Sequence, residues 1–253
     1  MSVVYYAVRS PVRPSPGPVL TLVILLGLGT LAPLGAQQWA VDDAAITPRG
    51  GCQLESWAGE PGAWLLPACT LLGPVEVTGG LAHFDRGTGK RELHGQLEAK
   101  LLFRDADVES WGWGLAVGAA FPFEEAEGVR RSSPSEFFAI VPLTLHIEGA
   151  PLPLSLHANA GWFHERELHG DHAHDHSGLL GGVRADLGLT ERVALIGELL
   201  ALEGEGTEAQ VGFTLALVPD LLFVDLSWGL HLSDRDDDPG LQVGIAWTPA
   251  PFR

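Results

Sequence analysis

The sequence predicts an all-β fold, an antiparallel transmembrane β-barrel of about twelve strands. Three observations lead to it. From Gly51 onward, apolar and polar residues alternate with a period of two, which is the pattern of strands with two different faces. The apolar face is nearly uninterrupted, as lipid requires, whereas the polar face is rich in small residues with scattered charges, as a narrow lumen requires. The connections alternate between long polar loops and tight turns, which is typical of outer-membrane barrels.

The first 36 residues have the features of a secretory signal peptide. Arg9 and Arg13 precede an apolar run over residues 18–37, and Ala36 provides a small residue near its end. An N-terminal membrane anchor is the alternative, but the run is short for a helix that spans a bilayer. We therefore expect residues 1–36 to be a signal peptide and residues 37–253 to form one barrel domain.

The alternation defines each strand in turn. In one segment, for example, Leu93 and Leu97 fall on the apolar face while His94 and Glu98 fall on the polar face. The segments are roughly 8 to 15 residues long, close to the length with which a tilted strand crosses a bilayer. No stretch shows helical periodicity. The expected strands cover residues 51–58, 63–72, 75–85, 91–103, 108–122, 136–147, 152–165, 178–189, 191–203, 207–218, 221–233 and 239–248.

The first expected hairpin is symmetric about the turn at residues 58–63. This symmetry places Cys52 opposite Cys69 and Trp57 opposite Trp64. Side chains that face each other across an antiparallel pair are close enough to interact, so a cross-strand disulfide is geometrically feasible. Export to an oxidising compartment favours the bond. Two free, buried thiols are the alternative.

The connections predict the orientation of the barrel. Odd-numbered connections such as "EEAEGVRRSSPS" are long and polar, whereas even-numbered ones such as "GP" and "TE" are tight. Because outer-membrane barrels carry their long loops outside the cell, an even strand count places both termini on the periplasmic side. A soluble β-sandwich or β-barrel is the competing interpretation, but its exposed face would be polar.

Composition limits the partners. The formal net charge is -17 and no basic stripe is present, which argues against a nucleic acid partner. The expected partners are outer-membrane lipid, lipopolysaccharide and a small-molecule solute. Basic residues in the long loops are placed to meet lipopolysaccharide phosphates, and they are Arg86, Lys90, Arg91, Arg130 and Arg131.

The segment "VDDAAITPRGGCQLESW", residues 41–57, resembles the opening of a family of outer-membrane barrels named for the MetA pathway of phenol degradation. The residues that match its "DD" segment, glycine and "Q-L-E" strand are Asp42, Asp43, Gly51, Gln53, Leu54 and Glu55. The strand and turn layout, including "LGLTERVALIGE", also fits that family. The resemblance implies a barrel of about this strand number and a role in moving small, often apolar, molecules across the outer membrane.

Ionisable residues at polar positions of the strands are the candidate lumen-lining residues. They are Glu76, His94, Glu98, Lys100, His157, Arg184, Asp186, Glu198, Asp225 and His231. One interpretation is that they line a pore and set its charge selectivity, in which case conductance should favour cations. The favoured interpretation is that they pair within a narrow or plugged lumen, since buried charges need partners. Arg184, next to the carboxylates, and Lys100, near Glu98 or Glu76, are then the neutralising residues.

The stretch "HGDHAHDHSG", residues 169–178, contains four of the ten histidines. Imidazoles and carboxylates suit Zn²⁺, Cu²⁺ or Ni²⁺, although this spacing does not enforce tetrahedral geometry. The candidate ligands are His169, Asp171, His172, His174, Asp175 and His176. We expect a flexible extracellular loop between the seventh and eighth strands, with weak metal binding as the alternative. No cofactor is expected.

The sequence contains no catalytic motif of the G-x-S-x-G or H-E-x-x-H type. The pairs Ser227 and His231, and His146 and Ser155, each lack a third member that would complete a catalytic triad. We therefore expect no enzyme but a passive channel in a Gram-negative-type outer membrane, for small solutes that include apolar or aromatic molecules. The alternative is a non-transporting surface protein whose extracellular loops bind metal or a partner.

Overall fold

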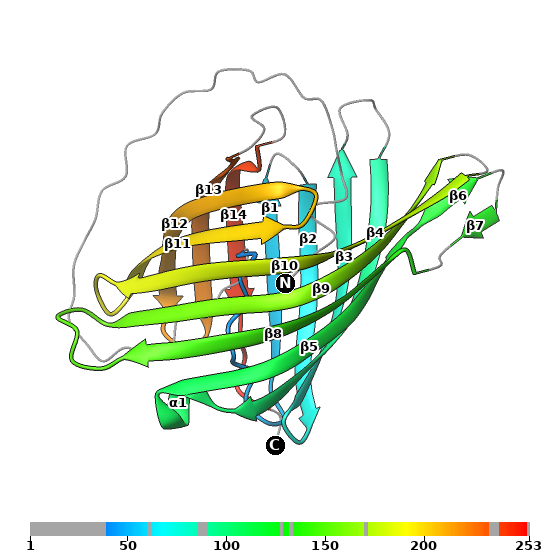
Figure 1. Cartoon of the computed structure of the whole chain (residues 1–253). Helices are drawn as coiled ribbons and strands as arrows, with labels where there is room; N and C mark the ends of the chain where they lie inside the picture. Colours follow the sequence, from blue (N-terminus) through cyan, green and yellow to red (C-terminus); the bar gives the residue numbers. More distant parts are fainter. Residues whose placement is uncertain are drawn as a thin grey trace.

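The computed structural model describes residues 39–59, 62–85, 91–126, 129–131, 134–169, 172–232 and 238–251. The predicted signal peptide lies outside these ranges. The described chain forms a closed antiparallel barrel of twelve strands, in which each strand pairs with its neighbours around the ring and β1 pairs with β14 to close it (Figure 1). The predicted fold class and strand number are confirmed.

The barrel strands agree with the expected bounds to within about three residues except at one hairpin. They are β1 (Cys52–Gly59), β2 (Gly62–Leu72), β3 (Val75–Asp85), β4 (Arg91–Arg104), β5 (Trp111–Pro122), β8 (Glu136–Ile147), β9 (Leu154–His169), β10 (His172–Gly188), β11 (Val193–Leu202), β12 (Gly206–Val218), β13 (Leu222–His231) and β14 (Gly240–Trp247).

The exception is the hairpin of β9 and β10, which extends through the histidine-rich stretch. His172 pairs with His169, and Asp175 pairs with Arg166, so both strands continue almost to the turn. The expectation of a flexible loop here is wrong. Histidines and aspartates that alternate keep the two-residue period of a strand, and their polarity alone disguised it.

A small two-stranded sheet and a single helical turn were not expected from the sequence. In the connection between β5 and β8, β6 (Glu124–Ala126) and β7 (Val129–Arg131) form a separate two-stranded sheet. In the connection between β4 and β5, α1 (Ala106–Glu109) forms one helical turn whose N-cap, Asp105, accepts a hydrogen bond from the amide of Asp107. Both elements are too short to give a periodic signal. No helix among the described residues is long and apolar enough to cross a membrane.

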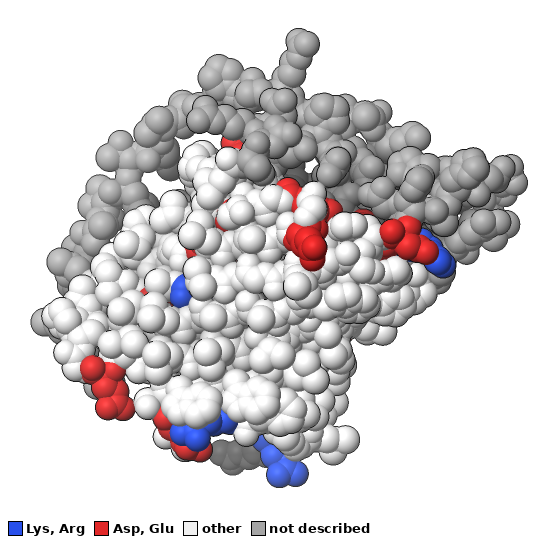
Figure 2. Space-filling view, viewed as in Figure 1, with Lys and Arg blue, Asp and Glu red and all other residues white. Residues whose placement is uncertain are grey.

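The barrel is apolar outside and polar inside. On β12, Val211, Phe213 and Leu215 are 49%, 47% and 40% exposed, whereas the intervening Thr214 is fully buried. Between the two ends of the barrel, the outer face seen in Figure 2 carries almost no charged side chains. A soluble barrel has the reverse arrangement, so these strands form a transmembrane barrel.

The first hairpin has the predicted symmetry. Cys52 lies opposite Cys69, and the two form a disulfide with an S–S distance of 2.08 Å. Trp57 lies opposite Trp64, and their rings stack with centroids 5.7 Å apart. The alternative of two free thiols is wrong. The disulfide thus links the beginning of β1 to β2, at the point where the chain emerges from the barrel interior.

The described residues that precede β1 lie inside the barrel (Figure 1, dark blue). We call residues 39–47 the lumen segment. Its Trp39, Val41 and Ala44 are at most 2% exposed. Val41 belongs to an apolar cluster contributed by β8 to β11, whose other members are Phe138, Ile140, Phe163, Leu180, Leu200 and Leu202. The interior is therefore filled in part by the chain's own N-terminal region.

Candidate functional site in the barrel lumen

The lumen segment follows the inner wall around half of the barrel. Ala40 and Val41 contact β11, and Thr47 contacts β3. Between these ends, the segment contacts β10, β9, β8 and β4. In the ring order, β11 and β3 are six places apart among twelve strands, so they lie on opposite sides. The two ends of the segment are therefore held on opposite sides of the barrel.

The beginning of the segment is held by a carboxylate and a guanidinium. The two oxygens of Glu198 on β11 accept hydrogen bonds from the amides of Ala40, at 2.8 Å, and Val41, at 2.9 Å. Arg184 on the adjacent β10 donates through Nη1 to the carbonyl oxygen of Val41, at 2.8 Å. One carboxylate thus satisfies two consecutive amides that the irregular backbone leaves without backbone partners.

The middle of the segment is held by neutral side chains. Asn159 on β9 accepts from the amide of Asp42 and donates to its carbonyl oxygen, with both distances 2.8 Å. Thr144 on β8 accepts from the amide of Ala44 at 2.8 Å through Oγ1. Asn159 and Thr144 were not among the expected lumen residues, because an uncharged polar residue at an inward position gives no distinctive sequence signal.

Two adjacent aspartates make the ion pairs of the segment. Lys100 on β4 lies 3.0 Å from Asp42 and 3.5 Å from Asp43, and Arg184 lies 3.7 Å from Asp43. Burial alone would raise the pKa of Asp43, but the charges of Lys100 and Arg184 lower it below its ordinary value. Lys100 was expected to be neutralised by Glu98 or Glu76. The carboxylates that form its ion pairs are instead Asp42 and Asp43 of the lumen segment.

The segment leaves the lumen at β3 and β2. Glu76 on β3 accepts a hydrogen bond from the amide of Thr47 at 2.7 Å. The hydroxyl of Thr47 donates to Thr70 on β2 at 2.9 Å. A turn at residues 48–51 then leads into β1. Both ends of the segment are therefore fixed to the wall.

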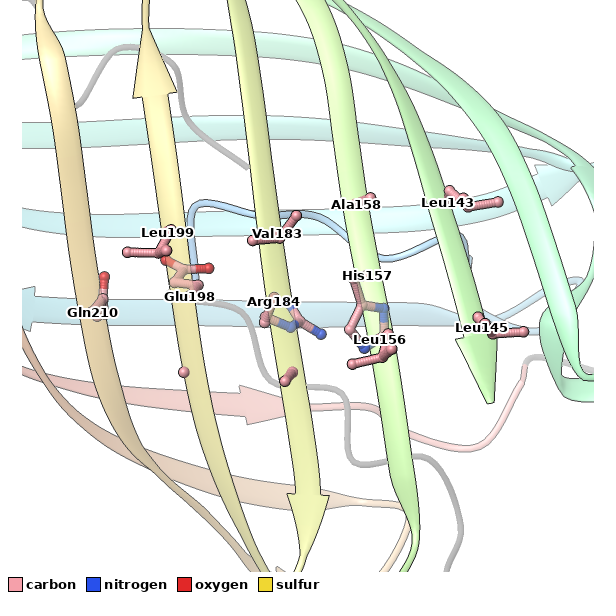
Figure 3. Close-up of a pocket in the computed structure, with 12 residues that line it drawn as sticks. Leu143, Leu145, Leu156, His157, Ala158, Val183, Arg184, Glu198, Leu199 and Gln210 are labelled. Atoms are coloured by element: carbon pink, nitrogen blue, oxygen red, sulfur yellow. The ribbon is translucent and has the colours of Figure 1, made fainter. Parts of the chain in front are cut away.

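Behind the segment, four wall residues form a second polar network. Arg184 makes a bidentate ion pair with Asp186, at 2.9 and 3.0 Å. His157 lies between Thr144, at 2.9 Å from its Nδ1, and Asp186, at 3.4 Å from its Nε2. Figure 3 shows the side chains of Arg184 and His157 next to each other on neighbouring strands. This network fixes the guanidinium that binds Val41 and Asp43.

The remaining predicted lumen residues also lie at inward positions. Glu98 is buried and accepts a hydrogen bond from Gln96 at 3.3 Å, and Asp225 is buried against the hydroxyl of Thr214. His94 is half-buried and packs edge-on against Phe84, with ring centroids 5.2 Å apart. His231 is half-buried at the end of β13. These residues therefore share the inner face with those that hold the lumen segment.

The buried charges are predominantly acidic. Among the described residues, eight buried carboxylates accompany two buried bases, Lys100 and Arg184. The carboxylates are Asp42, Glu55, Glu76, Glu98, Glu136, Glu198, Glu208 and Asp225. The described part of the interior therefore carries more carboxyl groups than bases.

A hollow of about 590 Å³ lies in the wall over β8 to β12 (Figure 3). Its lining combines outward-facing leucines with Arg184 and Glu198, the residues that hold the beginning of the lumen segment. Small residues, Ala158, Ala185 and Gly197, also line it. A Cβ atom added at Gly197 would meet nothing within 4 Å. The hollow therefore lies over the strands that hold the beginning of the segment.

The predicted metal site is only partly within the described residues. Asp171 and the side chains of His169, His172 and His174 lie outside them. The carboxylate of Asp175 pairs with Arg166 at 2.6 and 3.0 Å, and His176 contacts the carbonyl oxygen of Glu203 at 3.2 Å. No group of three or more His, Cys, Asp or Glu residues in the described part is arranged to hold a metal ion. Metal binding stays a prediction.

Of the two Ser–His pairs in the sequence, one has a carboxylate beside it. His146 contacts the hydroxyl of Ser155 through Nδ1 at 2.8 Å, and its Nε2 lies 3.3 Å from Asp107 of α1. The sequence analysis missed this third residue. In serine proteases, the serine contacts Nε2 of the histidine and the aspartate contacts Nδ1. Here Ser155 contacts Nδ1 and Asp107 contacts Nε2. The amide of His146 also donates to Ser110, so we interpret the group as a link between α1, β8 and β9.

The other pair is not assembled in this way. The hydroxyl of Ser227 accepts a hydrogen bond from Gln210 at 2.5 Å. His231 lies further along β13, where its amide donates to Asp238 at 2.7 Å. The basic loop residues expected to meet lipopolysaccharide stay a prediction. Arg86 and Lys90 lie outside the described residues, and so do the side chains of Arg91, Arg130 and Arg131.

The fold is shared with solved porin structures. A structure described as "KdgM porin" matches with a TM-score of 0.54 at 7% sequence identity, covering 79% of this chain and 99% of that chain. A structure described as "KdgM porin in complex with disordered oligogalacturonate" gives a TM-score of 0.52 at 9% identity, with coverages of 79% and 99%. At such low identities, the likeness shows the fold alone. A comparison with curated proteins gave no match.

The sequence itself identifies the family. The match extends over residues 23–245, and so includes the lumen segment and almost the whole barrel. The chain belongs to the family described as "Uncharacterised conserved protein UCP029691".

Proposed function

We propose that the protein is an outer-membrane channel for the passive passage of small solutes, narrowed by its own lumen segment. A closed barrel with an apolar outer belt suits a bilayer, since a closed ring of strands leaves no unpaired strand edge in lipid. The porin-like fold and the polar, partly buried interior support a passage through it. The predicted export signal supports the outer membrane as its location.

The observation that carries the solute class is the acidic lumen. Eight buried carboxylates against two buried bases favour cations and neutral solutes over anions. The ligand named for the similar porin structure, an oligogalacturonate, is an acidic oligosaccharide. This lumen has the wrong sign of charge for such a polyanion, so we propose small neutral or cationic solutes. Apolar and aromatic molecules, which the resemblance to the MetA-pathway family implies, stay a prediction within that class.

The test is reconstitution of the full chain in planar bilayers and liposomes. We expect a small conductance, a reversal potential in a potassium chloride gradient that indicates cation preference, and leakage of a neutral sugar faster than of its uronate. The lipid-facing variant Val211→Ala should behave like the natural chain. Preference for the uronate, or for chloride over potassium, would contradict the proposed solute class.

One observation favours the alternative, a non-transporting surface protein that binds metal or a partner through its outer hairpins. The two ends of the lumen segment are fixed on opposite sides of the barrel. If neither the natural chain nor a chain lacking residues 39–47 conducts or leaks, the channel is excluded and the alternative takes its place.

A further inference from the structure

The barrel wall contacts the lumen segment mainly through the segment's backbone. Wall side chains accept hydrogen bonds from five amides, those of Ala40, Val41, Asp42, Ala44 and Thr47. Wall side chains also donate to the carbonyl oxygens of Val41 and Asp42. Backbone groups are common to all peptides. These contacts would therefore bind another short peptide equally well if its backbone followed a similar path.

Two further contacts select side chains. The first is an apolar seat for Val41, made by Phe138, Phe163 and Leu200. Gly182 leaves room for it, because a Cβ atom there would lie 2.6 Å from Cγ2 of Val41. This seat accepts a branched apolar side chain.

The second selective contact is the pair of bases, Lys100 and Arg184, directly after the apolar seat. They hold Asp42 and Asp43 at 3.0 to 3.7 Å. Both bases are about 5% exposed. Loss of the aspartates would leave two buried positive charges with fewer partners, which is costly unless another anion replaces them. The wall therefore favours an apolar residue followed by carboxylates.

We infer that the inner wall from β3 to β11 is a binding site for short acidic peptides, and that residues 39–47 occupy it as an internal competitor. The inference goes beyond the proposed channel: the site lies in its lumen, where Lys100 and Arg184 give the acidic wall a local positive charge with which an acidic peptide can pair. The ligand it predicts has the order branched apolar, acidic, acidic, with free backbone amides on both sides. A peptide that enters would displace the segment and replace its contacts one for one.

The test uses the segment itself as a probe. The peptide WAVDDAAIT, acetylated and amidated, reproduces residues 39–47, and WAVNNAAIT serves as its neutral comparator. We expect a barrel that lacks residues 39–47 to bind WAVDDAAIT in calorimetry and to lose bilayer current on its addition. Binding of WAVNNAAIT should be weaker by about tenfold or more, because it forms no ion pairs with the two bases. The natural chain should bind neither peptide measurably.

A second variant protects the test against misfolding of the shortened chain. The full-length variant Asp42→Asn/Asp43→Asn keeps every backbone contact but weakens the internal competitor, so WAVDDAAIT should bind to it more tightly than to the natural chain. In either background, Asn159→Ala should weaken peptide binding. The lipid-facing variant Val211→Ala changes the outer side of the wall and should leave peptide binding unchanged.

The outcomes separate the two proposals. A folded, conducting variant whose current and binding heat do not respond to WAVDDAAIT overturns the peptide site and leaves the channel intact. Peptide binding that is insensitive to Asn159→Ala also overturns it, because the peptide would then be held elsewhere. Specific binding by a barrel that never conducts supports the peptide site and excludes the channel.

Discussion

At the scale of single residues, the position of the lumen segment depends on a glycine, which has no side chain to occupy the space. Gly182 faces inward, and its hydrogen atom lies where any other residue would push against Val41 and Leu200. The neighbouring Gly197 faces outward with nothing near it. Two glycines on paired strands therefore have different roles.

The variant Gly182→Val should displace the segment from β10. We expect higher bilayer conductance and a loss of stability of about 1–3 kcal/mol, the usual cost of overpacking. The two are measured by single-channel recording and by denaturant unfolding in detergent. Gly197→Val is the matched control and should leave conductance unchanged. Equal conductance of the two variants would contradict the proposed seat.

The charge of Asp43 gives a prediction about pH. Its pKa is lowered from the ordinary value of 3.8, so the ionised form is stabilised in the folded chain. This stabilisation is present in full above pH 3.8 and is lost as the pH falls through the lowered pKa. We expect acid to loosen the segment and to raise conductance below about pH 3.8. Asp43→Asn should reduce the response, and an unchanged acid response would assign it to other carboxylates.

The sequence predicts inward positions well and their partners poorly. A period of two is enough to place Lys100 and Arg184 on the inner face, because the faces of a strand alternate strictly. It does not reveal that Asp42 lies across from Lys100, because that contact depends on where an irregular segment runs in three dimensions. Two buried bases in an acidic lumen require counterions, and the adjacent aspartates ahead of the first strand were the available clue.

At the scale of elements, the β9–β10 hairpin changes the interpretation of the histidine-rich stretch. The backbone register pairs His172 with His169, and alternate positions on β10 share a face. The four histidine positions are therefore on one face of an ordered hairpin rather than spread along a loop. Such an arrangement favours metal binding more than the sequence spacing alone does.

Changing His169, His172, His174 and His176 to serine should abolish any zinc uptake near neutral pH. Stability should change by less than about 0.5 kcal/mol per site, the usual effect of a polar substitution outside a packed core. Calorimetric zinc titration and thermal unfolding measure the two effects. Uptake that persists in the variant would place the metal elsewhere on the protein.

The first hairpin allows a second prediction at this scale. Cys52 and Cys69 are separated by 17 residues in sequence, and strand pairing already holds them opposite each other. Replacing both with alanine should lower stability by about 2–4 kcal/mol, as expected for a loop of this length. Conductance should stay the same, because both cysteines lie at outward-facing positions of their strands. A change in ion selectivity would contradict this separation of roles.

At the scale of the whole molecule, the lumen combines an acidic wall with two bases that are neutralised by the segment. Without residues 39–47, the passage loses Asp42 and Asp43 while Lys100 and Arg184 remain. The passage therefore becomes wider and less negative at once. Its size and its charge selectivity are coupled through one stretch of chain.

Deletion of residues 39–47 should accordingly raise single-channel conductance and lower the preference for cations. Adding Lys100→Met to the deletion should restore part of that preference without reducing conductance. Reversal potentials in salt gradients measure the selectivity. A deletion variant that conducts more but is more cation-selective than the natural chain would show that the aspartates do not control the field in the passage.

The course of the lumen segment also has a consequence for assembly. It is the stretch that emerges first among the described residues, and it binds strands that follow at many different times, from β3 to β11. A chain already gathered around it has less conformational freedom to lose when the last strand meets the first. The residues that narrow the finished passage thus also connect strands that are far apart in the sequence.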